Sequence, residues 1–462
     1  MMTSDPKLIK NIYIKHYKNF SDPKSILMTP DNHVIYRHII NNSRGETWRR
    51  QSAVIRSLFA DSRLKLFAKK ITENLINLTD SLDKMIDNNN NDKAIDISQV
   101  FINHSIDLMA NCMFSLKQNT INSVDNKFSQ IIKQSTMPSK WRILASLVLP
   151  KFLVNVLDMS TIISRKYLDQ FVRLTVQELS KRISLPINTG NDDDNDFCQL
   201  LMNRCPDFIS NKTLDNNTNN NNNNNNKTSE SQISDLSQTL TNDELIANIY
   251  TLFDSAYGID YILKILIIYE LAINTECQQK CYDEIIANCF PDNNKPMTGQ
   301  NNIKFDYKTV DKLNYLDACI SEIMRLYAQI YREGRIARHD YTDETTGVTI
   351  KKGQVIQFSR SAVHRNSDYY PMPDQFRPER FVGKQNKHQL IESAVYLPFG
   401  LGRRMCPGYK FTLMTIKLTM AQLLVNYRFL PIPGLTKLRS ADPIVEHYSY
   451  YPGQLYLKIE KR

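Results

Sequence analysis

The sequence predicts a mainly α-helical protein with small β-sheets, and three observations support this. Apolar residues recur at helical spacing from about residue 61 to residue 185. The run from Leu245 to Ala272 is long and apolar enough to form a central buried helix. Strand-like alternation runs from Arg335 to Phe358, where Gly347 and Gly353 mark turns. Together these patterns indicate an α+β protein in which helices dominate.

The composition indicates a globular protein with a large core and without disulfides. The chain has 462 residues, of which 42% are hydrophobic and 10% aromatic, enough to bury a large core. Length alone would suggest two or three domains. The eight cysteines form no C-x-x-C pair, so neither a disulfide framework nor a zinc site is indicated. A reducing, cytosol-facing compartment fits this cysteine usage.

The basic charge and the first residues bear on partners and location. The formal net charge is +10, but lysines and arginines are spread along the chain and no nucleic-acid motif accompanies them. We therefore expect a solvated basic surface and no nucleic-acid partner. The first thirty residues contain no apolar run long enough for a signal peptide or a membrane anchor.

Taken in order, the chain shows one helix at 45–60 and further helices from 61 to 185, with a polar loop insert at Asn88–Asn91. The most apolar part is Trp141–Leu157, for which we favour packing in the core over contact with a membrane surface. Residues 188–240 hold NDDDND and an unbroken asparagine run, from which no core can be built, so they predict a disordered insert. Helical periodicity resumes at Thr241, which with Glu244 offers a cap for the central helix.

The stretch with the clearest chemistry is FGLGRRMCPG at 399–408, before an apolar helical run. Its cysteine, Cys406, stands near Arg404 at a helix N-terminus, and both effects favour a thiolate. Gly402 and Gly408 allow close backbone approach to the sulfur. Phe399 offers a flat aromatic face. A thiolate in such a setting is suited to hold a haem iron.

The pattern F-x-x-G-x-R-x-C-x-G resembles the cysteine loop of the cytochrome P450 family. The resemblance covers roughly residues 4 to 460 and implies a single domain over 1–462, folded as in that family. It implies haem b between a long central helix and the cysteine-loop helix, with Cys406 as axial ligand and metal ligand, and a propionate contact from Arg404. Relatives in eukaryotes usually begin with a membrane anchor, so we expect an N-terminally shortened chain. Peripheral association with the endoplasmic reticulum membrane is an open alternative.

A second match supports the resemblance. Glu322 and Arg325 lie one turn apart, a spacing that by itself usually means a surface ion pair of little worth. Their position before the cysteine loop resembles the family's buried pair, which a second arginine locks. Arg380, in the sequence FRPERF, fills that place. The resemblance therefore implies a structural triad of Glu322, Arg325 and Arg380.

Other cofactor contacts match less completely. Trp48 resembles the tryptophan of a W-x-x-x-R helix that holds a propionate, but Ser52 occupies the arginine position. Arg49 or Arg50 is a possible substitute. Arg338 falls where a propionate-binding arginine is expected, although an exposed strand arginine fits nearly as well. His364 lies downstream of these positions, and for it we favour helix packing over a metal role.

The central helix departs from the family, whose members carry an acid and a threonine that deliver protons. One register puts Gly258 at the acid and Ile259 at the threonine; the other puts Asp260 at the acid and Tyr261 at the threonine. A shift of two residues turns a helix by roughly 200°, so only one register can hold. We take Asp260 as the candidate catalytic residue.

The resemblance implies a monooxygenase that inserts one atom of dioxygen into a small lipophilic substrate. A reductase would supply electrons, docking on the basic face around the cysteine loop. Because the threonine is missing, an isomerase or dehydratase that needs no external electrons is an alternative. A degenerate, non-catalytic haem-binding protein is another.

Overall fold

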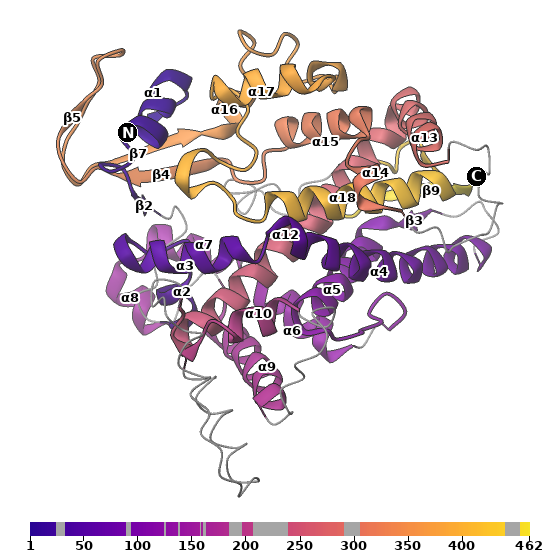
Figure 1. The fold of residues 1–462 in the computed structure, drawn as a ribbon, viewed down its shortest axis with the longest axis horizontal. Helices are drawn as coiled ribbons and strands as arrows, with labels where there is room; N and C mark the ends of the chain where they lie inside the picture. Colours follow the sequence, from indigo (N-terminus) through magenta and orange to yellow (C-terminus); the bar gives the residue numbers. More distant parts are fainter. Residues whose placement is uncertain are drawn as a thin grey trace, which may run out of the picture.

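The computed structural model describes residues 1–24, 33–88, 94–123, 126–136, 139–157, 159, 163–183, 196–206, 239–290, 305–438 and 453–462. Helices make up most of it, with small sheets at two sides (Figure 1), so the predicted mainly α class with small β-sheets is confirmed. The helices are α1 (Pro6–Lys10), η1 (Asn11–Lys15), α2 (Val34–His38), α3 (Gly45–Ser57), α4 (Asp61–Asn88), α5 (Ile97–Phe114), α6 (Lys127–Thr136), α7 (Lys140–Val148), α8 (Lys151–Val156), α9 (Arg165–Ile183), α10 (Phe197–Met202), α12 (Asn242–Ile273), α13 (Thr275–Cys289), α14 (Tyr307–Val310), α15 (Asn314–Leu326), α16 (Arg360–His364), η4 (Pro378–Phe381), α17 (Lys384–Glu392), η5 (Gly402–Arg404) and α18 (Tyr409–Asn426).

Three sheets accompany the helices. A four-stranded sheet has the order β1-β7-β4-β2, a three-stranded sheet β3-β9-β8, and β5 pairs with β6. In the first sheet β4 runs antiparallel to β7, with Arg335 opposite Ile356. Gly347 and Gly353 have φ of +67° and +80°, as expected of turns. The strands are β1 (Met2–Thr3), β2 (Asp22–Lys24), β3 (Ile95–Asp96), β4 (Arg332–Ile336), β5 (Tyr341–Thr342), β6 (Thr349–Ile350), β7 (Val355–Ser359), β8 (Tyr427–Pro431) and β9 (Tyr456–Lys461).

Helix α12 runs through the centre of the molecule (Figure 1) and packs against α5, α2, α9, α15 and α18. It begins in a capping box: the Thr241 hydroxyl accepts from the Glu244 amide, and the Glu244 carboxylate accepts from the Thr241 amide. It is apolar on nearly all sides because neighbouring helices surround it. The predicted buried helix and its cap are confirmed. This helix forms one wall of the main cavity.

Two segments differ from expectation. Within the predicted insert 188–240, the structure describes 196–206, which contains α10, and 239–240; the Phe197 ring of α10 stacks on Phe67 with centroids 4.0 Å apart. The prediction of disorder is therefore wrong there, because apolar residues 197–202 supply a face that packs into the core. The remainder, 188–195 and 207–238, lies outside the described residues. So do residues 89–91 of the predicted loop, whereas Asn88 ends α4.

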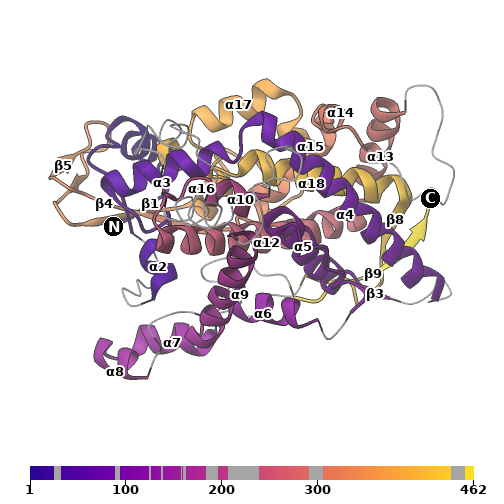
Figure 2. The ribbon, with the colours of Figure 1, turned by 60° about the horizontal axis from the view of Figure 1, so that its bottom comes forward.

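The second difference concerns Trp141–Leu157. We expected packing in the core, but this segment forms α7 and α8, which lie at one edge of the molecule (Figure 2). The exposed fractions of Trp141, Val148, Phe152 and Val156 are 67%, 70%, 66% and 77%. The expectation of core packing is therefore wrong for these side chains. Among the helices that the structure describes, none combines the length and apolar character needed to cross a bilayer.

Candidate haem site

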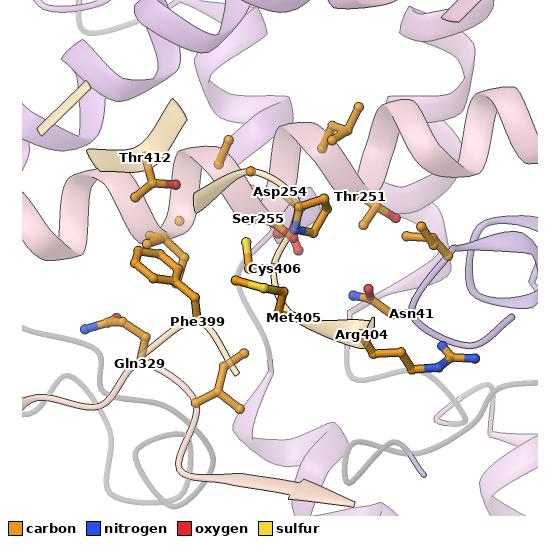
Figure 3. A pocket seen from close by; sticks show the side chains of 18 of the residues that line it. Asn41, Thr251, Asp254, Ser255, Gln329, Phe399, Arg404, Met405, Cys406 and Thr412 are labelled. Carbon is orange, nitrogen blue, oxygen red and sulfur yellow. The ribbon is translucent and has the colours of Figure 1, made fainter. Parts of the chain in front are cut away.

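A cavity of about 590 Å³ lies between α12 and the segment that carries Cys406. The Cys406 side chain points into it (Figure 3), and its backbone amide donates to the Phe399 carbonyl at 2.8 Å. Phe399 and Gly408 also line the cavity. With Arg404, which also borders it, the structure thus places four predicted residues of the cysteine loop around one space, opposite the wall formed by α12.

Burial and nearby charge act on the Cys406 thiol in opposite directions. Burial raises its pKa, whereas the Gly408 amide and the Arg360 and Arg56 cations lower it, and the net direction is upward. The sequence correctly indicated a helix start and nearby cations, which lower the pKa of the thiol. It did not indicate that burial raises that pKa by more. A coordinated metal ion deprotonates a thiol outright, so the thiolate form depends on the iron more than on the surrounding residues.

The two glycines have different reasons to be glycine. A Cβ at Gly408 would lie 3.2 Å from the Phe59 ring. Gly402 has a φ of +71°, and a Cβ there would collide with the Tyr13 carbonyl of η1. Gly402 does not line the cavity, so our interpretation that it admits backbone toward the sulfur is wrong. It is needed for the close approach of the N-terminal segment to the loop.

Arg404 borders the cavity but holds the surrounding chain as well. Its Nε donates to the Ser21 carbonyl and an Nη to the Ser43 carbonyl, each at 2.8 Å. Its guanidinium lies 4.4 Å from the centre of the Trp48 ring, and Trp48 also lines the cavity. Burial lowers the Arg404 pKa to about 10, so it remains a cation at neutral pH. The propionate contacts expected of Arg404 and Trp48 stay predictions.

The position predicted for the propionate-binding strand arginine is wrong, because Arg335 and not Arg338 borders the cavity. Arg338 pairs with Asp22 at 2.7 Å, its side chain is 42% exposed, and it does not line the cavity. Arg335 is 3% exposed and does line it. The two residues are three apart on or just beyond β4, and residues an odd number apart on a strand face opposite sides. The alternation of side chains along the strand would have distinguished Arg335 from Arg338, but only if it had been known which face of the strand meets the cavity.

The substitutes suggested for Ser52 are also misplaced. Arg49 pairs with Glu46 at the surface, and Arg50 pairs with Glu244. Arg56 instead lines the cavity, and its Nε donates to the Ser52 hydroxyl at 3.1 Å. Arg56 lies one turn after Ser52 on the same face of α3, a spacing that the sequence offered and our interpretation missed.

Sequence reasoning also missed Arg360, at the start of α16. It is 4% exposed and lines the cavity, and its Nη atoms donate to the Pro398 carbonyl and Glu333. Its buried Nε has no hydrogen-bond partner among the described residues. A cavity bordered by this group and by Arg56, Arg335 and Arg404 suits the carboxylates of a haem, because arginine pairs with carboxylate in a bidentate way. The residues present therefore fit the predicted cofactor.

The predicted triad comes together. Arg325 donates from Nε and an Nη to the Glu322 carboxylate at 2.7 and 2.8 Å, and Arg380 donates to it at 3.3 Å. Glu322 and Arg325 are fully buried. His364 lies nearby and is not a metal ligand here: its Nε2 accepts from the Leu397 amide at 2.8 Å. Burial lowers the pKa of His364 to about 3, so it stays neutral and packs as expected.

The register of α12 is decided against Asp260. Its carboxylate binds Lys264 and the Ser105 hydroxyl, each at 2.5 Å, on the side of α12 that meets α5. Asp260 does not line the cavity, so the catalytic role predicted for it is wrong. Ile259 and Tyr261, the two candidates for the threonine position, both line the cavity, but of the two candidates for the acid position only Gly258 does, which favours the register with Gly258 and Ile259. Asp254, which our sequence reasoning did not single out, also lines it (Figure 3).

Comparisons with known proteins agree with this arrangement. A family model described as "Cytochrome P450" matches residues 1–447. Cytochrome P450 9b2 of Drosophila melanogaster is 26% identical, over 94% of this chain and 78% of its own length. Cytochrome P450 3A12 of Canis lupus familiaris is 27% identical over 93% and 76%. A lithocholate 6-beta-hydroxylase of Mesocricetus auratus is 27% identical over 92% and 75%. The chain therefore belongs to the cytochrome P450 family, whose members are haem-iron monooxygenases.

Proposed function

We propose that the protein is a haem-thiolate monooxygenase that inserts one atom of dioxygen into a lipophilic organic substrate, with electrons from a reductase. The observation that carries the proposal is Cys406 inside a cavity bordered by buried arginines and closed by α12. Haem b, when bound, supplies the activation of dioxygen, and a thiolate ligand favours cleavage of the O–O bond. In this proposal Cys406 holds the iron, while Arg335, Arg360 and Arg404 hold the propionates.

The chain's remaining residues would bind substrate and exclude water. The cavity wall is largely apolar, which suits a lipophilic substrate and displaces water from the reacting centre. The residues that provide this apolar wall are Ile55, Phe59, Met109, Phe197, Leu252, Ile259, Ile262 and Phe411. The relatives' names are consistent with this class, since one is a hydroxylase of lithocholate.

The axial-ligand role of Cys406 has a spectroscopic test. Cys406→Ala removes the sulfur, so we expect the reduced, carbon monoxide-bound protein to lose its strongly red-shifted Soret band and its oxygenation activity. Cys289→Ala, which changes a half-buried cysteine outside the cavity, serves as the matched control and is expected to keep the band. A red-shifted band that survives in Cys406→Ala would refute the assignment. A wild-type protein that binds no haem would instead favour the degenerate, non-catalytic alternative.

The alternative of a haem-thiolate isomerase or dehydratase has one observation in its favour. Gly258 and Ile259 occupy the cavity positions where an acid and a hydroxyl would deliver protons, and neither can do so. A pre-oxidised substrate would need no such delivery and no reductase. Turnover with dioxygen and reductase, compared with turnover of an organic hydroperoxide without either, separates the two functions.

The missing hydroxyl also gives a prediction about coupling. Ile259→Thr places a hydroxyl in the cavity, so we expect a larger fraction of consumed dioxygen to end in product. The gain should stay below the roughly 10²- to 10⁴-fold effect of a complete acid–base group, because Gly258 still lacks an acid. Ile259→Val changes shape similarly without the hydroxyl and should not alter coupling. Equal coupling in both variants would contradict the prediction.

We further propose that α7 and α8 contact a membrane surface, which would place the protein peripherally at the cytosolic side of the endoplasmic reticulum. Their exposed apolar side chains support this. We expect Trp141→Ser with Phe152→Ser to weaken binding to phosphatidylcholine–phosphatidylserine vesicles by about tenfold or more, since each buried aromatic contributes roughly 1.5 to 3 kcal/mol. Ile391→Ser, at an exposed site on α17, is the control. Unchanged co-sedimentation of the double variant would exclude this surface.

A further inference from the structure

Charge is distributed unevenly around the cavity. Among the residues that the structure describes, its cations come from β2, α3, β4, α16 and the cysteine loop, and its acidic side chains are Glu333 and Asp254. Glu333 is neutralised, because Arg335 and Arg360 pair with it at 2.5 and 3.2 Å. The cationic residues that border the cavity are Lys24, Arg56, Arg332, Arg335, Arg360, Arg403 and Arg404. Asp254, by contrast, belongs to α12.

Asp254 has neither a cation nor a hydrogen-bond donor as partner among the residues that the structure describes. Burial raises its pKa to about 7, and no neighbouring charge adds to or offsets that effect. The cavity cations are therefore too distant to pair with it. Its side chain is half-buried because it borders the cavity, beside Thr251 on the same wall (Figure 3).

A carboxylate in this position is costly unless something pairs with it. Partly buried carboxylates in proteins are usually satisfied by hydrogen bonds or a counter-ion. Thr251 does not meet the need, since its hydroxyl already donates to the Ala247 carbonyl at 2.9 Å. The described residues supply no partner for Asp254, so a ligand that brings a positive charge or a strong donor into the cavity would meet an available carboxylate.

We propose that Asp254 is the counter-ion for an ammonium group of the substrate, so that the preferred substrates are lipophilic amines. The inference rests on the proposed monooxygenase function and narrows its substrate class. The apolar wall binds the hydrocarbon part, and Asp254 fixes the cationic end, which orients the molecule relative to Cys406 across the cavity. A neutral substrate of the same shape gains only the first of these interactions.

The test uses the haem-loaded protein and a matched pair of ligands. One is a phenylbutyl trimethylammonium ion, whose charge does not titrate and whose nitrogen cannot coordinate iron. The other is the neutral hydrocarbon in which carbon replaces that nitrogen. Affinities are measured by equilibrium dialysis at pH 8, where Asp254 is mainly ionised, for the wild type, Asp254→Asn, Asp254→Glu and Asp243→Asn. The last removes an exposed acid from the same helix and controls for overall charge.

We expect Asp254 to raise the affinity for the cation at least about tenfold relative to that for the hydrocarbon, because it adds an ion pair that the hydrocarbon cannot form. Asp254→Asn should remove that preference while changing hydrocarbon affinity less than twofold. Asp254→Glu and Asp243→Asn should keep it. If Asp254→Asn lowers the affinity for both ligands equally, Asp254 only packs. If it lowers neither affinity, Asp254 does not pair with the bound cation. Either result overturns the proposal.

The failure of this inference can be told from failure of the proposed function. The carbon monoxide spectrum of each sample reports thiolate-bound haem independently of the ligand pair. A normal red-shifted band with no preference for the cation overturns only the role of Asp254. A better coupling of dioxygen to product in the wild type than in Asp254→Asn, with equal affinities for the two ligands, would make Asp254 a proton donor and would also overturn the proposal.

Discussion

Glu322→Ala is expected to lower the free energy of unfolding by about 3 to 5 kcal/mol, because it strands a buried cation. The Glu322 carboxylate accepts four hydrogen bonds: two from Arg325, one from Arg380 and one, at 2.9 Å, from the Arg377 amide. Arg325 also donates to the His364 carbonyl at 2.8 Å. Loss of the acid therefore removes the group that joins α15 to the segment around η4.

The effect of Glu322→Ala can be measured as the shift in the urea midpoint together with the fraction of protein that keeps the thiolate band. Glu379→Ala removes a neighbouring acid of η4 whose side chain is 54% exposed and should stay within about 0.5 kcal/mol of the wild type. If Glu322→Ala unfolds at the same urea concentration as Glu379→Ala, the buried network does not stabilise the fold.

Lys264→Met should be comparably destabilising, because it strands a buried anion where Glu322→Ala strands a buried cation. Lys264 is fully buried between α12 and α5, and its ammonium lies 2.5 Å from Asp260 and 2.9 Å from Nδ1 of His104. Burial lowers the pKa of Lys264 and the Asp260 carboxylate raises it, with a net lowering. Burial, and to a lesser degree the nearby ammonium, holds the pKa of His104 well below its usual range. Burial persists in the variant, so we expect His104 to stay neutral and not to replace the lost cation. The variant thus leaves the buried Asp260 carboxylate with the Ser105 hydroxyl but without a cation, at a cost of about 3 to 5 kcal/mol.

A double-mutant cycle separates this charge effect from packing. Asp260→Asn combined with Lys264→Met leaves no unpaired charge, so the double variant should be more stable than Lys264→Met alone, by about 1 kcal/mol or more. Additive losses for the two substitutions would contradict a direct interaction between the two side chains. Neither residue lines the cavity, so the carbon monoxide band of the folded fraction should be unchanged.

The sequence was informative where short spacings determine the geometry. Cys406, Phe399 and Gly408 lie within ten residues, so their convergence on one cavity follows from local structure. Glu322 and Arg325 share one helix turn, and Arg380 lies in a matching motif. These assignments needed no knowledge of how distant elements pack.

The residues that the sequence misassigned depend on packing between distant elements. Arg335 and Arg338 exchange roles because the pairing of β4 with β7 and β2 decides which face meets the cavity. Asp260 lost its expected role because Lys264 and the Ser105 hydroxyl of α5 draw it to the other side of α12. Asp254 carries no motif, and only the cavity reveals it. In each case the error concerns which face of a strand or helix meets the cavity. The periodicity of the sequence does not determine this.

The contact between Arg404 and the Ser21 carbonyl joins groups 383 residues apart. At a synthesis rate of roughly 5 to 20 residues per second, Ser21 leaves the ribosome about 20 to 80 s before Arg404 is made. The N-terminal segment can pair with β4 and β7 only after residues 332–359 are made, and its docking is completed when Gly402 and Arg404 follow. Capture of the cofactor is consequently a late event, which follows translation of nearly the whole chain and requires the nascent polypeptide to be kept from aggregating meanwhile.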